Sequence, residues 1–402
     1  MVKEISREFR IKAAVVTAAL SLCALHFSPA LASISLFLFF GCTFSLFDKA
    51  EFLNQKILVI AAFLWCICQL TIQFGFGYDT ESMRKALLRL PLLLLPVIWC
   101  VRTAVAPRFI AVVILCLGVF HSWIGGASVL NYFAHFRFLN QMVLESKPLP
   151  LFSSVYHIEF SLILAVVSIL QLSFLKNSGI GWQRGLMFAS LIINILSLHI
   201  LSARTGILAF WLGVPFLTGA ISLPIWLNGP RKWLLLLLPI GLLMAVPSLR
   251  NRVVNTIEDL MAVKQSQNLS DKSFGRRWEA WKVAAETIKE KPLSGVGMSG
   301  VENAMQSGFE RKQSYLHITD RIQPHNQFLE LALQTGLIPL VIFLISMLLI
   351  FRHYRHNGNF AGLAVLAALG VSMFFESYLE RQSGVAVFIV SFFFVLFAEK
   401  KE

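Results

Sequence analysis

Long runs of hydrophobic residues recur along almost the whole chain and are separated by short polar segments. A run of about 17 to 25 apolar residues can cross the hydrocarbon core of a bilayer, which is roughly 30 Å thick, as a single helix. We therefore expect an all-α integral membrane protein with about twelve transmembrane helices. The expected spans lie near residues 11–27, 30–47, 57–74, 86–101, 109–124, 158–175, 186–201, 205–222, 233–249, 326–351, 360–378 and 384–398.

One polar segment is too long to be a simple connector between two spans. It follows nine expected spans in residues 1–249, occupies residues 250–324, and precedes three further spans in residues 325–402. We expect it to form a large, partly helical loop outside the membrane, before the tenth span.

Within this loop, the sequence RRWEAWKVAAETIKEKP predicts an amphipathic helix that ends before Pro292. Trp278, Trp281, Ala285 and Ile288 recur at spacings of three and four residues, so they would share one face of the helix. This face would lie either on the outer surface of the bilayer, with its tryptophans at headgroup depth, or against the transmembrane helices.

Composition supports the membrane class. Of 402 residues, 56% are hydrophobic and only 14% are charged, whereas about 25% of residues are charged in a typical soluble domain.

The six cysteines all fall within apolar runs. They therefore predict neither a disulfide framework nor a cysteine-based metal site.

The distribution of charge predicts the orientation. Lysine and arginine concentrate in the N-terminal tail, in alternate short loops and at the C-terminus. Short cytoplasmic loops are enriched in these residues, so we expect both termini in the cytoplasm and the large loop on the opposite side. The net charge of +13 follows largely from this topology, and it predicts no binding of nucleic acid.

Nucleotide and metal chemistry find little support in the sequence. The segment GVGMSG at residues 295–300 has the glycine spacing of a dinucleotide-binding motif, but it follows a helix and a proline rather than a strand. We expect a flexible turn there. The sequence contains neither a Walker A motif nor a paired Asp-x-Asp motif, so we expect no cofactor and no metal.

Two arginine clusters fall where the outer side of the chain meets the bilayer. Arg204 lies in LSARTG, between apolar runs so close that only a tight hairpin fits, and an arginine at membrane depth is a functional candidate. The alternative is that it extends to the headgroups. Arg276 and Arg277 begin the amphipathic helix, where guanidinium groups and free backbone N–H groups suit an anion. The alternative for them is a solvated pair.

A third cluster, QPHNQFLE, opens the tenth expected span and contains His325. Histidine exchanges a proton near neutral pH, although a structural role is the alternative. Because the three clusters share one interface, they suit a lipid whose phosphate or pyrophosphate lies at headgroup depth. The imidazole would deprotonate an incoming hydroxyl, which predicts group transfer from a lipid-linked donor.

The motifs SARTG, GRRWEAW and PHNQFLELALQTGLIPL, in this order, resemble those of the O-antigen ligase family, and the resemblance covers essentially the whole chain. The same superfamily contains O-antigen polymerases and some protein O-oligosaccharyltransferases. The later segment ESYLERQSG adds Glu376, Glu380 and Arg381 on the same side of the membrane.

The resemblance implies that Arg204 and Arg277 hold the pyrophosphate of an undecaprenyl-pyrophosphate-linked glycan, with Arg276 as the alternative ligand. His325 would deprotonate a sugar hydroxyl of the lipid A–core acceptor, and the glycan would be transferred with inversion and without a metal. Three further residues would support the site: Glu376, Arg381 and Asn326.

The resemblance also implies a multi-pass protein of the bacterial inner membrane, with a periplasmic site and with membrane lipids as partners. The motifs do not separate a ligase from a polymerase or a protein O-oligosaccharyltransferase. We favour the ligase because His-Asn at the start of the tenth span is typical of it. A transporter is the alternative from another class; it would place charged groups near the bilayer midplane, and Arg89 is the main charge so placed here.

Overall fold

The computed structural model of the protein describes residues 2–74, 79–101, 105–179, 181–217, 241, 245–264, 272–312, 314 and 316–398. The regular structure of these residues is helical, apart from an isolated β-bridge between Phe47 and Val101. This confirms the all-α fold class.

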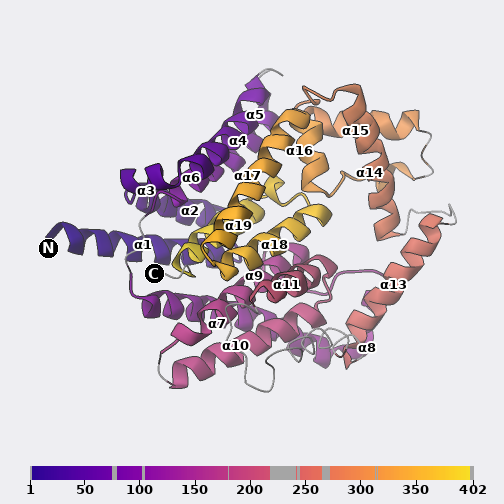
Figure 1. Ribbon diagram of the computed structural model, residues 1–402. Coiled ribbons are helices and arrows are strands. Elements are labelled where there is room, and N and C mark those ends of the chain that lie inside the picture. The colour runs from indigo at the N-terminus through magenta and orange to yellow at the C-terminus, as the bar shows by residue number, and fades with distance from the viewer. Residues whose placement is uncertain are drawn as a thin grey trace.

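Eleven of the helices precede the predicted outer loop, and Figure 1 shows how they are arranged. They are α1 (Val2–Ala24), α2 (Pro29–Phe44), α3 (Lys49–Asn54), α4 (Lys56–Phe74), α5 (Thr80–Arg89), α6 (Leu94–Ile98), α7 (Pro107–Ala134), α8 (Phe136–Leu144), α9 (His157–Phe174), α10 (Gly181–Ile200) and α11 (Arg204–Leu217). The later helices are α13 (Pro247–Lys264), α14 (Ser273–Glu290), α15 (Gly300–Arg311), α16 (Gln327–Thr335), α17 (Leu337–His356), α18 (Phe360–Phe375) and α19 (Gln382–Val395).

Among the described helices, α7, α9, α10 and α17 are long and apolar enough to cross a membrane. Shorter apolar helices lie at five other expected spans: Pro29–Phe44, Lys56–Ile67, Arg204–Leu217, Phe360–Phe375 and Gln382–Ala398. Most of the expected span 233–249 lies outside the described residues. The total of about twelve spans therefore stays a prediction.

Two of the expected spans are not continuous helices. Residues 86–101 divide into the end of α5, a 3-10 turn at Leu90–Leu93 and the short helix α6, because Pro91 and Pro96 cannot donate backbone hydrogen bonds. Residues 326–351 divide into α16 and α17 at Gly336, whose φ of +83° is incompatible with a continuous helix.

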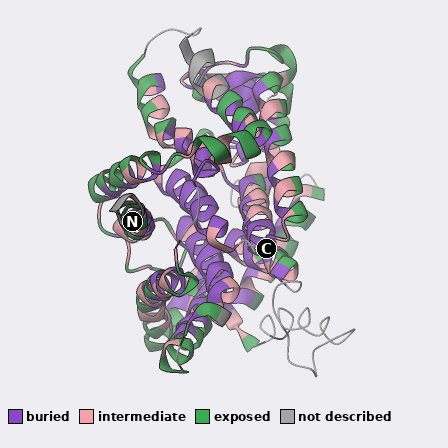
Figure 2. Ribbon diagram, turned by 60° about the vertical axis from the view of Figure 1, so that its left-hand side comes forward, coloured by how far each residue is buried: buried purple, intermediate pink, exposed green. Residues whose placement is uncertain are grey.

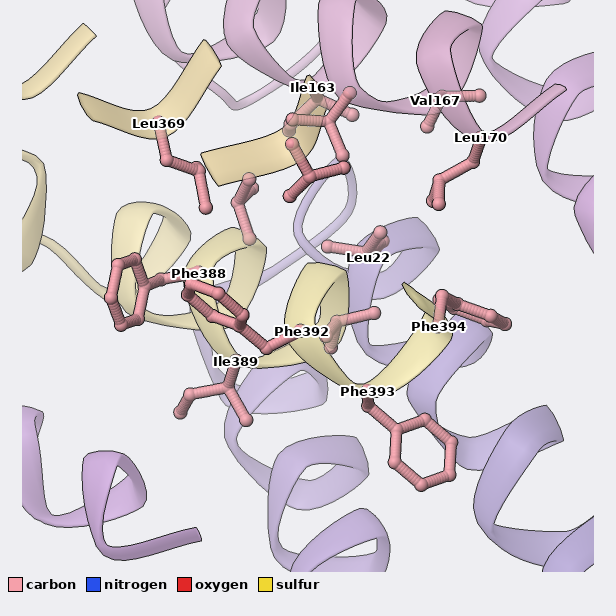
Figure 3. Packing of buried hydrophobic residues seen from close by; sticks show 14 of the residues in the cluster. Leu22, Ile163, Val167, Leu170, Leu369, Phe388, Ile389, Phe392, Phe393 and Phe394 are labelled. Carbon is pink, nitrogen blue, oxygen red and sulfur yellow. The ribbon is translucent and has the colours of Figure 1, made fainter. Parts of the chain in front are cut away.

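The core of the bundle is built around α19. Every residue from Ser383 to Val395 is buried, as expected for a helix that is hydrophobic on all sides. Figure 3 shows Phe388 and Phe392 of α19 in the same cluster as Leu369 of α18 and side chains of α1 and α9. The buried interior is surrounded by exposed helix faces in Figure 2.

The described part of the outer loop forms a small helical layer beside the bundle, and Figure 1 shows α13, α14 and α15 together on one side. Its own hydrophobic cluster joins α14, α15 and α16. The buried face of α14 consists of Gly275, Ala280, Val283, Ala284 and Thr287.

The face expected for α14 is divided in the structure. Trp278 and Ala285 are exposed, whereas Trp281 and Ile288 are partly buried. The small residues Ala280 and Ala284 form much of the contact face, and Gly308 of α15 allows close approach, since a Cβ there would lie 2.5 Å from Val283 Cγ1. Helix α14 packs on α13, α15 and α16, and the choice between the two expected placements stays a prediction.

The GVGMSG segment fixes this layer to the bundle. The backbone N–H groups of Val296 and Gly297 donate to the carbonyl oxygens of Leu333 (2.7 Å) and Gln334 (3.0 Å) at the end of α16. Gly295 has a φ of +68°, and a Cβ there would lie 2.5 Å from the Leu333 oxygen. The segment is thus a closely packed turn rather than the flexible turn that we expected.

We predict that Gly295→Ala destabilises the protein. Alanine at a positive φ costs about 1–2 kcal/mol, and the new methyl group would also meet the α16 backbone. Gly300→Ala is the matched control, because a Cβ at this position of α15 would make only an ordinary contact with Val296 at 3.5 Å. Thermal unfolding of the purified proteins should show a lower Tm for Gly295→Ala alone; equal Tm values would contradict the packed turn.

Candidate functional site

His325 lies immediately before α16 in an uncommon backbone conformation. Its φ is +47°, in the left-handed region where histidine is one of the residues found more often. The next residue, Asn326, is the N-cap of α16, and its side-chain oxygen accepts hydrogen bonds from the backbone N–H groups of Phe328 (3.0 Å) and Leu329 (3.1 Å). Asn326 therefore fixes the turn that carries the imidazole.

The carboxyl group of Glu376 joins His325 to the outer loop. Glu376 follows α18, and one of its oxygens lies 2.9 Å from His325 Nδ1. The other oxygen accepts a hydrogen bond from the guanidinium of Arg277, which also donates to the carbonyl oxygen of Phe375 at 3.0 Å. The site therefore combines α14, the start of α16 and the end of α18.

The charge state of Glu376 determines which nitrogen of His325 is reactive. Glu376 is buried, and its carboxyl group meets the guanidinium of Arg277 through one oxygen and the imidazole of His325 through the other. The positive charge of Arg277 favours the ionised carboxylate, which only accepts hydrogen bonds. His325 Nδ1 then carries a proton, and Nε2 is the nitrogen that can accept one from a substrate.

The side chain of the adjacent arginine, Arg276, points in a different direction from that of Arg277. Its guanidinium lies 3.6 Å from Asp320, in the segment that leads to α16. Successive helical residues are separated by about 100° around the axis, so the two side chains separate at the first turn of α14. The structure places Arg277, and not Arg276, in contact with the partner of His325.

Arg204 lies at the start of α11, after a tight turn in which Ser202 has a φ of +51°. Its guanidinium is 3.8 Å from Asp259 of α13 and is about one-third exposed. Asp259 also accepts a hydrogen bond from the backbone N–H of Phe274 at 3.0 Å, in the first turn of α14. Asp259 therefore links Arg204 to the helix that carries Arg277, and the two arginines interact electrostatically.

Sequence reasoning missed a further arginine at this site. Arg252 of α13 is buried, and it donates to the carbonyl oxygen of Lys147. Burial and the nearby charge of Arg204 lower its pKa to about 10. The sequence does contain a pattern that indicates this residue. Arg252, Asn255 and Asp259 recur at spacings of three and four residues, so they form a polar face of one helix.

Sequence reasoning also missed His157. It begins α9, and the charges of Arg252, Glu376 and Arg277 act on it. The described residues thus bring three guanidinium groups and two imidazoles into one region. Nothing in the spacing of residue 157 relative to the other motifs indicates this, because the proximity is purely tertiary.

Arg381 contributes to the other side of Glu376. Its guanidinium donates to Glu159 at 2.5 Å and lies 5.6 Å from the centre of the Tyr156 ring. Arg381, Glu159 and Glu376 line a hollow of about 10 Å³, which is about the space that one water molecule needs. Arg381 is therefore paired and remains beside the site, as a supporting residue would.

A buried polar network holds the segments that carry His325 and Glu376 together. Arg89 of α5 pairs with Glu380 and donates to Gln334 Oε1 at 2.6 Å. Gln334 of α16 donates in turn to Glu380 at 3.0 Å and to Glu330 at 2.8 Å. The charge of Arg89 thus has a structural explanation that requires no transport path.

A second contact joins the same segments, because the backbone N–H of Leu379 donates to the side-chain oxygen of Gln327 at 2.7 Å.

The described residues contain no group of three or more His, Cys, Asp or Glu side chains that could hold a metal ion. Positive charge at the site comes from guanidinium groups. Arg277 is engaged by Glu376, and Arg252 by a backbone carbonyl, whereas Arg204 has a long ion pair and a partly exposed guanidinium. Of these three arginines, Arg204 is therefore the one whose guanidinium is least engaged by other groups of the protein.

A family model described as O-antigen ligase matches residues 189–344. The match covers less than half of the chain, and it shows that this part of the chain is similar to the O-antigen ligase family. The matched segment contains Arg204, Arg277 and His325, whereas Glu376 and Arg381 lie beyond it. The resemblance seen in the sequence motifs is thereby confirmed.

The apolar helices of the structure agree with a multi-pass membrane protein. An uncharacterized protein of Haemophilus influenzae is 25% identical over 180 residues, which cover 43% of this chain and 44% of that protein. The chain thus matches less than half the length of this relative.

We predict that Arg89→Met strongly destabilises the protein. Removing the arginine would leave Glu380 and Glu330 without their buried counter-charge, and loss of one partner of a buried ion pair costs about 3–5 kcal/mol. Arg84→Met on the same helix is the control, because Arg84 is well exposed and pairs only with Glu81. Thermal unfolding would contradict the role of the network if both variants had the same Tm.

Proposed function

We propose that the protein is an inverting, metal-independent glycosyltransferase that acts as an O-antigen ligase. It transfers a glycan from undecaprenyl pyrophosphate to a sugar hydroxyl of lipid A–core, on the periplasmic face of the bacterial inner membrane. The observation that carries the proposal is the contact of His325 with an ionised Glu376 beside Arg277, close to the arginines of α11 and α13.

The arginines account for the donor. A pyrophosphate carries several negative charges, and guanidinium groups bind phosphate oxygens through two parallel hydrogen bonds. Arg204 would make the first contact, because its pair with Asp259 is long and easily exchanged. Arg277 would contribute positive potential while it holds Glu376, and Arg276 would remain with Asp320.

The histidine accounts for the acceptor. His325 Nε2 would take the proton from the acceptor hydroxyl as that oxygen attacks the anomeric carbon of the donor glycan. The bond between this carbon and the pyrophosphate oxygen breaks, and the leaving group keeps the electron pair. Guanidinium groups stabilise the charge that develops on it. A single displacement inverts the configuration of the anomeric carbon.

Complementation of two deletion strains tests the proposed reaction. We expect the gene to restore glycan-capped lipid A–core in a strain that lacks its ligase. It should not restore chain elongation in a strain that lacks its polymerase. Restoration of chain length alone would identify a polymerase and contradict the proposal. Restoration of neither, with the protein inserted and abundant, would also contradict it.

We predict that His325→Ala abolishes most of the transfer activity without loss of the folded protein. A general base contributes about 10²–10⁴-fold to a rate, so kcat should fall by a factor in this range. His317→Ala is the control, because His317 is an exposed histidine of the same loop. Transfer of labelled glycan to lipid A–core by the purified proteins measures both. Wild-type kcat in His325→Ala would remove the histidine from the mechanism.

We predict that Arg204→Lys weakens use of the donor, because one ammonium group cannot reproduce a two-pronged contact with phosphate. A charged hydrogen bond contributes about 1.5–3 kcal/mol, so kcat/KM for the donor should fall about 10- to 100-fold. Arg311→Lys is the control, since Arg311 pairs with Glu290 on the exposed side of the loop. An unchanged kcat/KM in Arg204→Lys would exclude the proposed contact.

A further inference from the structure

Helix α13 has the opposite polarity from a helix that faces water. Its buried residues recur mostly at spacings of three and four. Four of them are polar or charged (Ser248, Arg252, Asn255 and Asp259), and the other two are Leu249 and Ala262. A water-facing helix of a globular protein buries its apolar stripe and exposes its charges. We propose that α13 lies in the outer interface of the phospholipid bilayer, with its apolar face against lipid.

The polar face is held in place by specific contacts. Ser248 Oγ donates to the carbonyl oxygen of Ile200 at 2.7 Å. Asn255 Nδ2 donates to the carbonyl oxygen of Val143 at 3.0 Å and lies 3.1 Å from Ser146 Oγ. Arg252 and Asp259 are engaged as described above. These bonds fix the rotation of the helix, so its opposite face cannot turn inward.

The outer face is apolar over about two turns, apart from the exposed Glu258, whose carboxylate lies 3.5 Å from Lys272 Nζ. Val254, Ile257, Leu260 and Met261 are between 45% and 56% exposed. The exposed residues Arg250 and Lys264 lie on the same side, one at each end of this stripe. We call Val254, Ile257, Leu260 and Met261 the outer stripe of α13.

Three observations identify the bilayer as the partner of the outer stripe. The helix contacts α10, which is long and apolar enough to span a membrane. An apolar stripe with basic residues at its ends is typical of helices that lie in a membrane interface. Arginine and lysine at these ends complement the anionic headgroups of phospholipids. Residues 250–264, which we assigned to a loop outside the membrane, therefore belong to its surface.

This placement has a consequence for the donor that rests on the proposed function. Arg252 and Asp259 form the inner face of α13, and Arg204 lies against Asp259. Only the width of one helix would then separate the lipid from the arginines. A pyrophosphate at headgroup depth would reach Arg204 by lateral movement in the membrane, without its prenyl chain leaving the hydrocarbon.

Site-directed spin labelling tests the placement without any assay of activity. Nitroxide labels would be attached to Ile257→Cys in a cysteine-free variant of the full chain, after that variant is shown to keep the wild-type Tm. The protein would be reconstituted in vesicles of phosphatidylethanolamine and phosphatidylglycerol. Accessibility to oxygen, which concentrates in lipid, is compared with accessibility to a water-soluble nickel chelate.

Two further positions calibrate the measurement. Leu344→Cys reports the exposed apolar face of α17, and Lys289→Cys reports an exposed polar position of α14. We expect the ratio of oxygen to nickel accessibility at Ile257 to be several times that at Lys289 and close to that at Leu344. A ratio equal to that at Lys289 would place the stripe in water and overturn the proposal. Low accessibility to both reagents would show that protein covers it, which would also overturn the proposal.

Discussion

The two oxygens of the Glu376 carboxylate connect three segments that are far apart in the sequence. One oxygen meets His325, which is 51 residues away, and the other meets Arg277, which is 99 residues away. Because a carboxylate in a buried position must be neutralised by partners, neither contact can be removed without a cost to the other. The orientation of the imidazole, the docking of α14 and the end of α18 all depend on this group.

The same constraint governs the charges around the site. Arg89 is matched by Glu380 and Arg381 by Glu159. Arg204 and Arg276 differ, because their ion pairs are long, at 3.8 Å and 3.6 Å, and both side chains are about one-third exposed. Of these two, Arg204 is the one that interacts electrostatically with Arg277. An anionic substrate would bind where a guanidinium has a long ion pair and is exposed, so the quality of the pairing matters more than the number of arginines. The arginines with short, buried ion pairs stabilise the fold instead.

Much of this arrangement could be predicted from the sequence, because it depends on local patterns. Apolar runs predicted the helices, and three motifs predicted that Arg204, Arg277 and His325 lie close together, which agrees with their links through Asp259 and Glu376. Prolines 91 and 96 and Gly336 were visible in the same sequence, but their effect on two expected spans was not appreciated. The turn at Gly295 and Gly297 was interpreted as flexible, although the absence of a Cβ at Gly295 permits a close contact with α16 and the Gly297 N–H donates to it.

Other features could not be predicted because they arise only from tertiary contact. The pairing of Glu376 with His325 is one, and the proximity of His157 to the arginines is another. The division of Arg276 and Arg277 between two carboxylates also depends on where the segment with Asp320 lies. The buried face of α14 was not predicted, because the periodicity of the larger apolar residues does not mark the small residues Ala280 and Ala284, which allow close packing between helices.

The most direct test of the account is a double-mutant cycle on the pair that orients the base. Single-turnover rates of glycan transfer would be measured for the wild type, for His325→Ala, for Glu376→Gln and for the double variant. If Glu376 acts through His325, the loss caused by Glu376→Gln should disappear when His325 is already absent, since residues that act as a unit are not additive. Independent, additive losses would contradict the central claim that Glu376 and His325 form one functional unit.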